Sequence, residues 1–339
     1  MGFENPVWIL IRWRLNMNYR TLGKTGLRIS EVGYGAWGIG KTSWIGASDD
    51  ESILALNRSI ELGLNFIDTA LGYGNGHSER IVGQVVREHT EQIYVATKIP
   101  PKNSQWPARA GVRAEETFPA EHVITSTETS LRNLGLDTID VQQFHVWSDE
   151  WVGQGDWLEG VSKLKEQGKI RFFGVSINDH QPNNAIKLIE TGVVDSVQVI
   201  YNIFDQSPED QLLAACEKHN VGVIVRVPLD EGGLTGAITP ETTFDEGDFR
   251  NGYFRGDRKQ EVYDRVQKIA SDLHITTQAL AETSLRFILS HSAVSTVIPG
   301  MRSIRNVERN MQVSDGVRLS SEQLHILKSH RWIRDFYKA

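Results

Sequence analysis

The chain is poor in cysteine, in long apolar runs and in positive charge. Its 339 residues include one cysteine, Cys216, so no disulfide can form within the chain, and a reducing compartment is compatible with it. The formal net charge of −7 offers no general attraction to nucleic acid or to an anionic membrane. The ten histidines do not show the spacing of a metal site. We therefore expect no metal, no nucleic-acid partner and no membrane partner.

The first 16 residues differ from the rest of the chain. They contain the apolar run Val7-Trp8-Ile9-Leu10-Ile11, which basic residues follow. This run of about five residues is too short for a membrane span or for the apolar part of a secretion signal. We interpret residues 1–16 as an extension outside the fold, with Met17 as an alternative start, and residues 17–339 as one domain. A membrane-touching anchor is the other interpretation, and we expect a cytoplasmic protein.

After a hairpin predicted at residues 19–30, strand-like and helix-like segments alternate. Eight strands in alternation with helices predict a parallel sheet with right-handed crossovers, and the count of eight favours a closed (β/α)8 barrel, with the hairpin capping its bottom. Two long connections, 100–119 and 230–258, follow strands and should lie over the active face. The predicted strands are 31–36, 65–68, 93–98, 139–145, 170–176, 196–200, 221–227 and 294–299, and the predicted helices are 50–62, 78–87, 120–134, 157–167, 181–190, 208–219 and 277–290.

Four residues suited to proton transfer lie at or just after the ends of predicted strands. Asp68, Lys98 and His145 each end a strand, and Tyr73 follows five residues after Asp68, between two glycines. Chemistry in such barrels collects at the C-terminal ends of the strands, so we expect these side chains to meet. An ammonium close to a phenol lowers the phenol's pKa, and an imidazole can hydrogen-bond a substrate oxygen. The alternative is a salt bridge that plugs the barrel, beside an unrelated tyrosine and histidine.

A glycine pattern at residues 33–38 fits the dinucleotide fingerprint G-x-G-x-x-G, but no helix is predicted to open at its third glycine. We therefore reject a doubly wound dinucleotide-binding site. Glycines such as Gly35 more simply allow the backbone to approach a ligand at the barrel mouth.

At these residues the chain resembles the aldo-keto reductases, over residues of about 19–310. The motif Asp-Thr-Ala-x-x-Tyr-Gly, which begins at Asp68, is specific, and Lys98 and His145 follow in the expected order. The opening Tyr-Arg-x-Leu-Gly-x-Thr-Gly-Leu and the triplet Gly35-Ala36-Trp37 are similar to the bacterial and potassium-channel-β branches. The resemblance implies reversible NADPH-dependent reduction of an aldehyde or ketone to an alcohol. Tyr73 would be the general acid, its pKa lowered by Lys98 and Asp68, and His145 would orient the carbonyl oxygen.

The resemblance also implies NADPH or NADP as cofactor. Ser176, Asn178 and Gln198 would contact the carboxamide. Arg226 stands where the family usually has a stacking aromatic residue, and a guanidinium can stack on a ring. Arg302 could pair with a 2′-phosphate, which favours NADP over NAD. The predicted cofactor residues are Gly35, Trp37, Ser176, Asn178, Gln198, Arg226, Pro228, Leu229, Gly233, Leu234, Gly236, Gly300, Arg302, Asn306 and Asn310, and the predicted substrate residues are Trp37, Trp44 and Trp147.

Three functions remain open from the sequence. The complete set of four residues favours a reductase for a small carbonyl or alcohol substrate. Arg226 leaves room for a non-catalytic NADPH-binding regulatory subunit, similar to potassium-channel β-subunits. A barrel lyase or isomerase would require the four residues to be unrelated. The sequence does not identify the substrate, the preferred direction or the oligomeric state, for which a monomer is the default.

Overall fold

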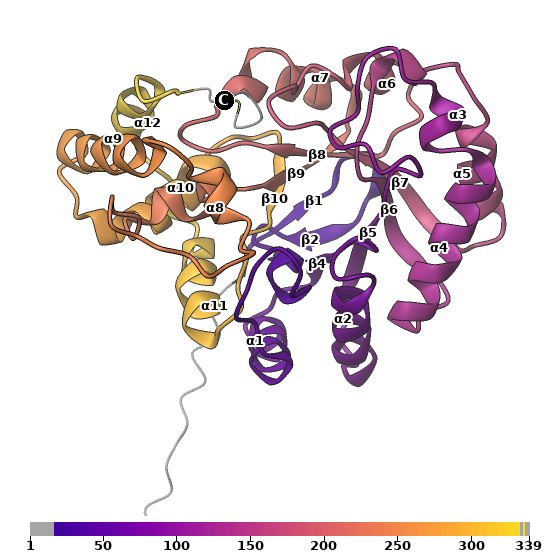
Figure 1. Ribbon diagram of the computed structural model, residues 1–339, viewed down its shortest axis with the longest axis horizontal. Helices are drawn as coiled ribbons and strands as arrows, with labels where there is room; N and C mark the ends of the chain where they lie inside the picture. Colours follow the sequence, from indigo (N-terminus) through magenta and orange to yellow (C-terminus); the bar gives the residue numbers. More distant parts are fainter. Residues whose placement is uncertain (1–16, 333–334, 336–339) are drawn as a thin grey trace, which may run out of the picture.

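Eight parallel strands lie next to one another in chain order and form a barrel that helices surround (Figure 1). The computed structural model describes residues 17–332 and 335, so our interpretation of residues 1–16 falls outside the described part of the chain. Single bridges join Val32 to Val297 and Gly35 to Gly300, and so link the first strand to the last. The predicted (β/α)8 barrel is confirmed. Its strands are β3 (Tyr34–Gly35), β4 (Phe66–Asp68), β5 (Tyr94–Ile99), β6 (Ile139–Phe144), β7 (Ile170–Ser176), β8 (Ser196–Ile200), β9 (Gly222–Arg226) and β10 (Val294–Val297).

A two-stranded hairpin covers the N-terminal end of the barrel, as predicted. Its strands β1 (Tyr19–Thr21) and β2 (Arg28–Ser30) pair antiparallel. Leu22, Leu27 and Ile29 are buried in one apolar cluster with side chains from β4, β5, β6 and β9. This end is closed by apolar packing, which leaves the C-terminal ends of the strands for a site.

The helices between the strands form the outer layer, and the space between sheet and helices holds the main apolar core. Each helix presents one apolar stripe inward; α1, for example, buries Ala55, Leu56 and Ile60. None of the helices in the described residues is long and apolar enough to cross a bilayer. The helices are α1 (Asp49–Glu61), α2 (His77–Glu88), α3 (Ala114–Thr117), α4 (Ala120–Leu134), α5 (Trp157–Glu166), α6 (Ile186–Glu190), α7 (Leu212–His219), α8 (Arg250–Tyr253), α9 (Arg258–Asp272), α10 (Leu280–Leu289), α11 (Ile304–Met311) and α12 (Ser321–Lys328).

The helices differ from expectation at several places. Helices α3, α8, α9, α11 and α12 were not predicted, and α6 and α7 begin at Ile186 and Leu212 rather than at residues 181 and 208. The sequence predicted a helix over residues 78–87, but α2 begins at His77, after Gly76, whose φ of 76° only glycine adopts freely. Ser78 is buried instead, and its hydroxyl donates to the carbonyl oxygen of Ala36 at 2.8 Å. This bond ties α2 to the end of β3. Helix α9 was not expected, because its 15 residues are mostly polar or charged and its buried stripe is narrow.

Candidate active site

Tyr73 lies on a loop after β4 that packs against the loop after β3. A Cβ added to Gly74 would stand 2.0 Å from the carbonyl oxygen of Gly40, and the φ of Gly74 is 65°. A side chain at position 74 is therefore excluded both by the contact with Gly40 and by the left-handed backbone conformation. The chain then returns toward the barrel, and the backbone N–H of Tyr73 donates to the Ala70 carbonyl at 3.0 Å. This local path holds the Tyr73 phenol over the strand ends.

The side chains of Asp68 and Lys98 form a buried ion pair at the ends of β4 and β5. Lys98 Nζ lies 2.5 Å from Asp68 Oδ2, 2.9 Å from the carbonyl oxygen of Thr69 and 3.2 Å from the Tyr73 hydroxyl. An ammonium has three N–H groups, and these three contacts use them all. The lysine is thus oriented by two acceptors, and its third N–H points at the phenol.

Two amides hold the carboxylate of that pair. Asp68 Oδ1 accepts from Gln143 Nε2 at 3.1 Å and from Gln198 Nε2 at 2.7 Å. Both glutamines are buried, in β6 and β8. Asp68 therefore has partners on both oxygens, and its position is fixed from three strands.

The surroundings keep Lys98 charged and Tyr73 protonated. Burial alone would lower the pKa of Lys98, but the Asp68 charge and the contact with Tyr73 outweigh it and raise that pKa. Burial raises the pKa of Tyr73 above its ordinary value of 10, although Lys98 pulls it down. Our expectation that Lys98 and Asp68 together lower the pKa of Tyr73 was therefore wrong, because desolvation dominates and the Asp68 charge acts in the same direction as desolvation. At neutral pH Tyr73 holds a proton that it can donate.

His145, directly after β6, is neutral. Burial, followed by the charges of Lys98 and Arg226, holds its pKa well below 6.5. Its ring lies edge-on to that of Tyr73, with 5.5 Å between centroids. Within residues 17–332 and 335, the buried Nδ1 of His145 has no hydrogen-bond partner. We refer to Asp68, Tyr73, Lys98 and His145 together as the tetrad, and its free imidazole nitrogen suits a substrate oxygen.

Aromatic rings surround the tetrad, though not all of the predicted ones. The Trp37 ring lies 6.4 Å from that of Tyr73 and 5.1 Å from that of Phe249. Trp106, 43% exposed, stands edge-on to His145 at 4.3 Å. Trp147, by contrast, is fully buried among aromatic residues of the core, where it presents no surface to a substrate.

Sequence reasoning placed the loops of Trp106 and Phe249 over this face and gave Trp106 a role in gating entry, but it did not count Trp106 among the substrate residues and it missed Phe249. Their apolar character was the available signal. Which side chain of a long loop turns inward depends on the loop's path.

The chain from the end of the hairpin to beyond α12 matches one family model, described as the aldo/keto reductase family, over residues 31–331. The chain belongs to the aldo/keto reductase family. Uncharacterized oxidoreductase YqkF of Bacillus subtilis (strain 168) is 30% identical to this reductase over 326 residues, which cover 95% of this chain and 99% of that protein. The resemblance that the tetrad motif suggested is confirmed, and the chain is an oxidoreductase.

Two solved structures of the family share the fold. The holo form of aldo-keto reductase AKR11C1 from Bacillus halodurans has a TM-score of 0.73 and 27% identity, and the likeness covers 93% of this chain and 96% of that chain. An aldo/keto reductase from Klebsiella pneumoniae in complex with NADP and acetate has a TM-score of 0.64 and 25% identity, with 92% and 95% covered. These likenesses support a nicotinamide cofactor for the reductase described here.

The residues predicted to face the nicotinamide end lie around the tetrad, but several have partners within the chain. The amide of Gln198 points at Asp68. The amide of Asn178 accepts from the Ala108 N–H at 3.2 Å and donates to the Ala108 carbonyl at 3.0 Å, and so holds the loop of residues 100–119. Arg226, at the end of β9, pairs with Asp179. Ser176 ends β7 and is buried.

The loop after β9 carries the predicted residues Pro228, Leu229, Gly233, Leu234 and Gly236, and its backbone is unusual. Val227, Asp230 and Glu231 all have φ near +50°, which is rare outside glycine and strained for a β-branched residue. A Cβ on Gly233 would stand 2.4 Å from Asp230 Oδ2, and one on Gly236 would stand 2.5 Å from the Thr277 carbonyl oxygen. Burial raises the pKa of Asp230 to about 7 and that of Glu231 to about 8. A side-chain oxygen of Asp230 thus requires glycine at 233, and the backbone of Thr277 requires glycine at 236.

The predicted adenosine end lies after β10. Gly300 pairs with Gly35 across the barrel seam, and the position where a Cβ would stand on Gly300 is open space. Arg302 runs across Gly38, where a Cβ would meet its Cδ at 2.9 Å. In α11, Asn306 is exposed and Asn310 is buried. An open glycine beside a guanidinium is a suitable cradle for a phosphorylated ribose.

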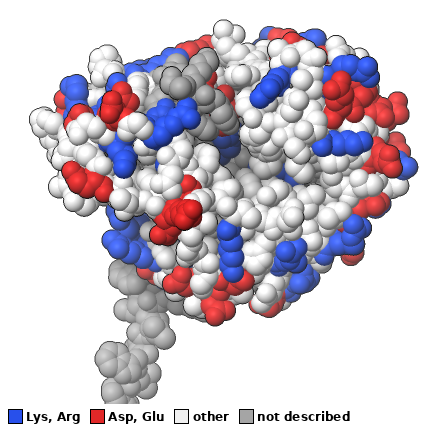
Figure 2. All heavy atoms as spheres, viewed as in Figure 1, with Lys and Arg blue, Asp and Glu red and all other residues white. Residues whose placement is uncertain are grey.

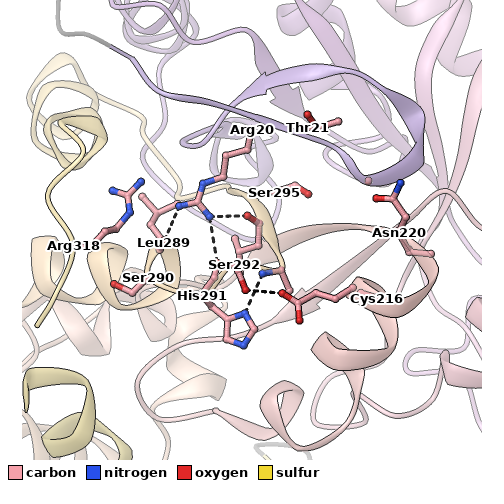
Figure 3. A pocket seen from close by; sticks show the side chains of 15 residues that line it. Arg20, Thr21, Cys216, Asn220, Leu289, Ser290, His291, Ser292, Ser295 and Arg318 are labelled. Atoms are coloured by element: carbon pink, nitrogen blue, oxygen red, sulfur yellow. Dashed lines mark hydrogen bonds between the residues drawn. The ribbon is translucent and has the colours of Figure 1, made fainter. Parts of the chain in front are cut away.

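A cavity of about 580 Å³ lies away from this site, beside the hairpin at the other end of the barrel (Figure 3). Arg20 in its wall donates to the carbonyl oxygens of Leu289, His291 and Val294 and pairs through Nε with Glu31 at 3.0 Å, so this cation already has partners from α10 to β10 and a carboxylate. Acidic and basic side chains are intermingled over the face in Figure 2, where no charge of one sign dominates. Neither feature competes with the tetrad as a catalytic centre.

Proposed function

We propose that this reductase is an NADP(H)-dependent enzyme that reduces an aldehyde or ketone reversibly, with Tyr73 as the general acid. One observation carries the proposal: a buried ammonium, held by Asp68, directs an N–H at a protonated phenol 3.2 Å away. A plain salt bridge that plugs the barrel would not need a phenol on the third N–H. The neutral imidazole of His145 beside it supplies a second group for a carbonyl oxygen.

The proton moves from Tyr73 to the substrate oxygen in this scheme. A bound nicotinamide cofactor supplies the hydride to the carbonyl carbon. As negative charge builds on the substrate oxygen, the Tyr73 hydroxyl and the free nitrogen of His145 stabilise it by hydrogen bonds. The phenolate that forms is stabilised by Lys98, whose orientation Asp68 fixes. Reprotonation from solvent restores Tyr73, and the reverse sequence oxidises an alcohol.

The residues at the mouth fit a nicotinamide cofactor. Ser176 ends β7 and Arg226 ends β9, on either side of β8, and both would hold the nicotinamide end. Gly300 leaves open space next to Arg302. Among the described residues, Arg302 donates to the Ile45 carbonyl oxygen and forms no ion pair with a carboxylate. A guanidinium in that place would bind a 2′-phosphate, and this supports NADP(H) over NAD(H). Trp37 and Trp106 give the substrate side apolar walls, which suit a small carbonyl compound with an apolar body.

The regulatory alternative has one observation in its favour. Arg226, in place of a stacking aromatic residue, pairs with Asp179 and donates to the Ile177 carbonyl oxygen at 2.9 Å. A cofactor held without proper nicotinamide contact would bind but would not react.

The deciding experiment joins NADPH fluorescence titration with absorbance decay of NADPH in the presence of an aromatic aldehyde. We expect binding with turnover, and we expect Tyr73→Phe to retain binding while losing about 100-fold or more in kcat. Tyr94→Phe makes the same chemical change at the start of β5, at the far end of the barrel, and should leave kcat unchanged. Binding without turnover in the native chain would favour the regulatory alternative.

A further inference from the structure

Two arginines from different loops meet over one tryptophan at the barrel mouth. The guanidinium carbon of Arg250 lies 4.2 Å from the ring centroid of Trp44, and that of Arg302 lies 5.4 Å from it. Arg250 opens α8, Arg302 follows β10, and Trp44 lies between β3 and α1. Three segments far apart in the chain thus place two cations on one aromatic surface.

The segment that carries Arg250, residues 244–257, is fastened across to the loop of Trp44; we call this segment the strap. The N–H of Phe249 donates to the Ser43 carbonyl oxygen at 2.8 Å, and the N–H of Ile45 donates to Asp248 Oδ2 at 3.3 Å. The Phe249 ring also packs on Trp37. The position of Arg250 is therefore set by contacts of the two residues that precede it, Asp248 and Phe249.

The two arginines differ in their partners. Asp248, 3% exposed, accepts from Nε and from Nη2 of Arg250, each at 2.8 Å. Arg302 donates from Nη1 to the Ile45 carbonyl oxygen at 2.9 Å, and no carboxylate of the described residues forms an ion pair with it. Burial, and then the charge of Arg250, lower the pKa of Arg302, while Asp248 and Glu51 act on it only through their more distant charges. A guanidinium without a carboxylate partner, next to a second guanidinium, favours a bound anion.

We propose that Arg250 is a second anchor for the cofactor's 2′-phosphate, beside Arg302, with Trp44 as the surface that holds both guanidiniums. This inference rests on the proposed function, since it requires NADP(H) as the cofactor. A phosphate monoester carries up to two negative charges and three acceptor oxygens, enough for two guanidiniums at once. A cofactor without that phosphate brings no hydrogen-bond acceptor to Arg250, which then keeps Asp248 as its carboxylate partner. Arg250 therefore distinguishes NADPH from NADH.

The test compares affinities rather than turnover. NADPH and NADH are titrated by fluorescence into the native chain and into Arg250→Gln, Arg250→Lys and Arg302→Gln. Adenosine 2′,5′-bisphosphate and AMP are titrated by calorimetry as probes with and without the 2′-phosphate. The matched control is Arg109→Gln, which removes one exposed arginine from another loop of the same face.

For Arg250→Gln we expect the Kd of NADPH and of adenosine 2′,5′-bisphosphate to rise about tenfold or more, as is typical when a charged hydrogen-bond partner is lost. The Kd of NADH and AMP should stay unchanged, as should all values for Arg109→Gln. The Kd of NADPH for Arg250→Lys should lie between those of the native chain and of Arg250→Gln, because lysine keeps the charge but lacks the planar fork of donors.

Two results overturn the inference. An equal loss for NADPH and NADH would show that Arg250 shapes the loop rather than binds the phosphate. A loss confined to Arg302→Gln would leave Arg302 as the anchor and Arg250 without this role. Failure of the native chain to bind any nicotinamide cofactor would instead refute the proposed function itself, so the two failures are distinguishable.

Discussion

Replacement of Lys98 by methionine separates a catalytic ion pair from a purely structural one. Lys98 Nζ lies 2.5 Å from Asp68 Oδ2, and the two side chains are 0% and 3% exposed. Methionine keeps most of the apolar stem but leaves the Asp68 carboxylate buried with only the two amide donors of Gln143 and Gln198. Loss of one partner from a buried pair costs about 3–5 kcal/mol. We expect the free energy of unfolding to fall by about 3 kcal/mol, since the amides remain.

The same substitution has a separate effect on catalysis. A full negative charge on the Tyr73 oxygen, 3.2 Å from Lys98 Nζ, would be stabilised by about 5 kcal/mol at an effective dielectric constant of about 20. If about half of that charge develops in the transition state, Lys98→Met forfeits about 2.5 kcal/mol. This corresponds to a loss in kcat of roughly 50- to 100-fold.

A double variant separates the two effects. Lys98→Met combined with Asp68→Asn removes both charges, while the new amide oxygen at position 68 can still accept from Gln143 and Gln198; removal of both members of a buried pair is often neutral for stability. We expect the urea midpoint of the double variant to return most of the way to that of the native chain, while kcat for an aromatic aldehyde stays low. Recovery of kcat along with stability would refute the reasoning, because the ammonium would then serve only to plug the barrel.

Three further outcomes are expected. The reduction rate should stay flat from about pH 6 to 9 at saturating cofactor, because the pKa of His145 lies well below 6.5 and that of Tyr73 above 10. The pKa values of Asp230 and Glu231, raised to about 7 and about 8, make Asp230→Asn and Glu231→Gln the controls, and an inflection near pH 7 that persists in both variants would contradict this assignment. Burial raises the pKa of Asp230 from 3.8 to about 7, so folding favours its protonated form. The resulting stability is fully present below about pH 4 and has been lost once the pH has risen through 7. Asp230→Asn should flatten the Tm–pH profile between about pH 4 and 7, and an unchanged slope there would exclude Asp230 as its source. Gly74→Ala should lower the free energy of unfolding by about 2–4 kcal/mol and reduce kcat, because the added Cβ would clash with the loop that carries Gly40. The control, Gly111→Ala, has a similar φ but open space around the added Cβ, so the free energy of unfolding should fall by only about 1 kcal/mol. Equal urea midpoints for the two variants would show that the contact with the loop of Gly40 is unimportant.

The barrel and the tetrad could be predicted because both follow from local patterns. Asp68 and Lys98 meet because adjacent parallel strands end at the same edge, and apolar runs reveal where those strands end. The course of the loops is not contained in such patterns. Trp147 comes two residues after His145 and was expected in the pocket, yet the chain turns there and buries it in the core. Trp106 lies beside the imidazole instead, although it is distant in sequence.

The protonation of Tyr73 was also beyond local reasoning. Nearby charges can be listed from strand ends, but the loss of solvent around a phenol depends on every element that packs near it. Desolvation is the largest effect on its pKa, and it opposes that of Lys98. A motif thus identifies the reacting group more readily than its proton affinity.

The bonds between Asn178 and Ala108 have a consequence for engineering. One amide side chain satisfies both the N–H and the carbonyl of a residue two positions after Trp106, as a neighbouring strand would. The substrate-side loop is thus held from two segments: by Asn178 after β7, and after β6 by Glu150, which accepts from the Gly111 N–H at 2.8 Å, and Trp151, whose Nε1 donates to the Val112 carbonyl oxygen at 2.7 Å. An attempt to change substrate preference by transplanting a loop from another family member should carry a compatible residue at position 178 with it, since the new loop would otherwise lose its contact with the β7–α6 segment.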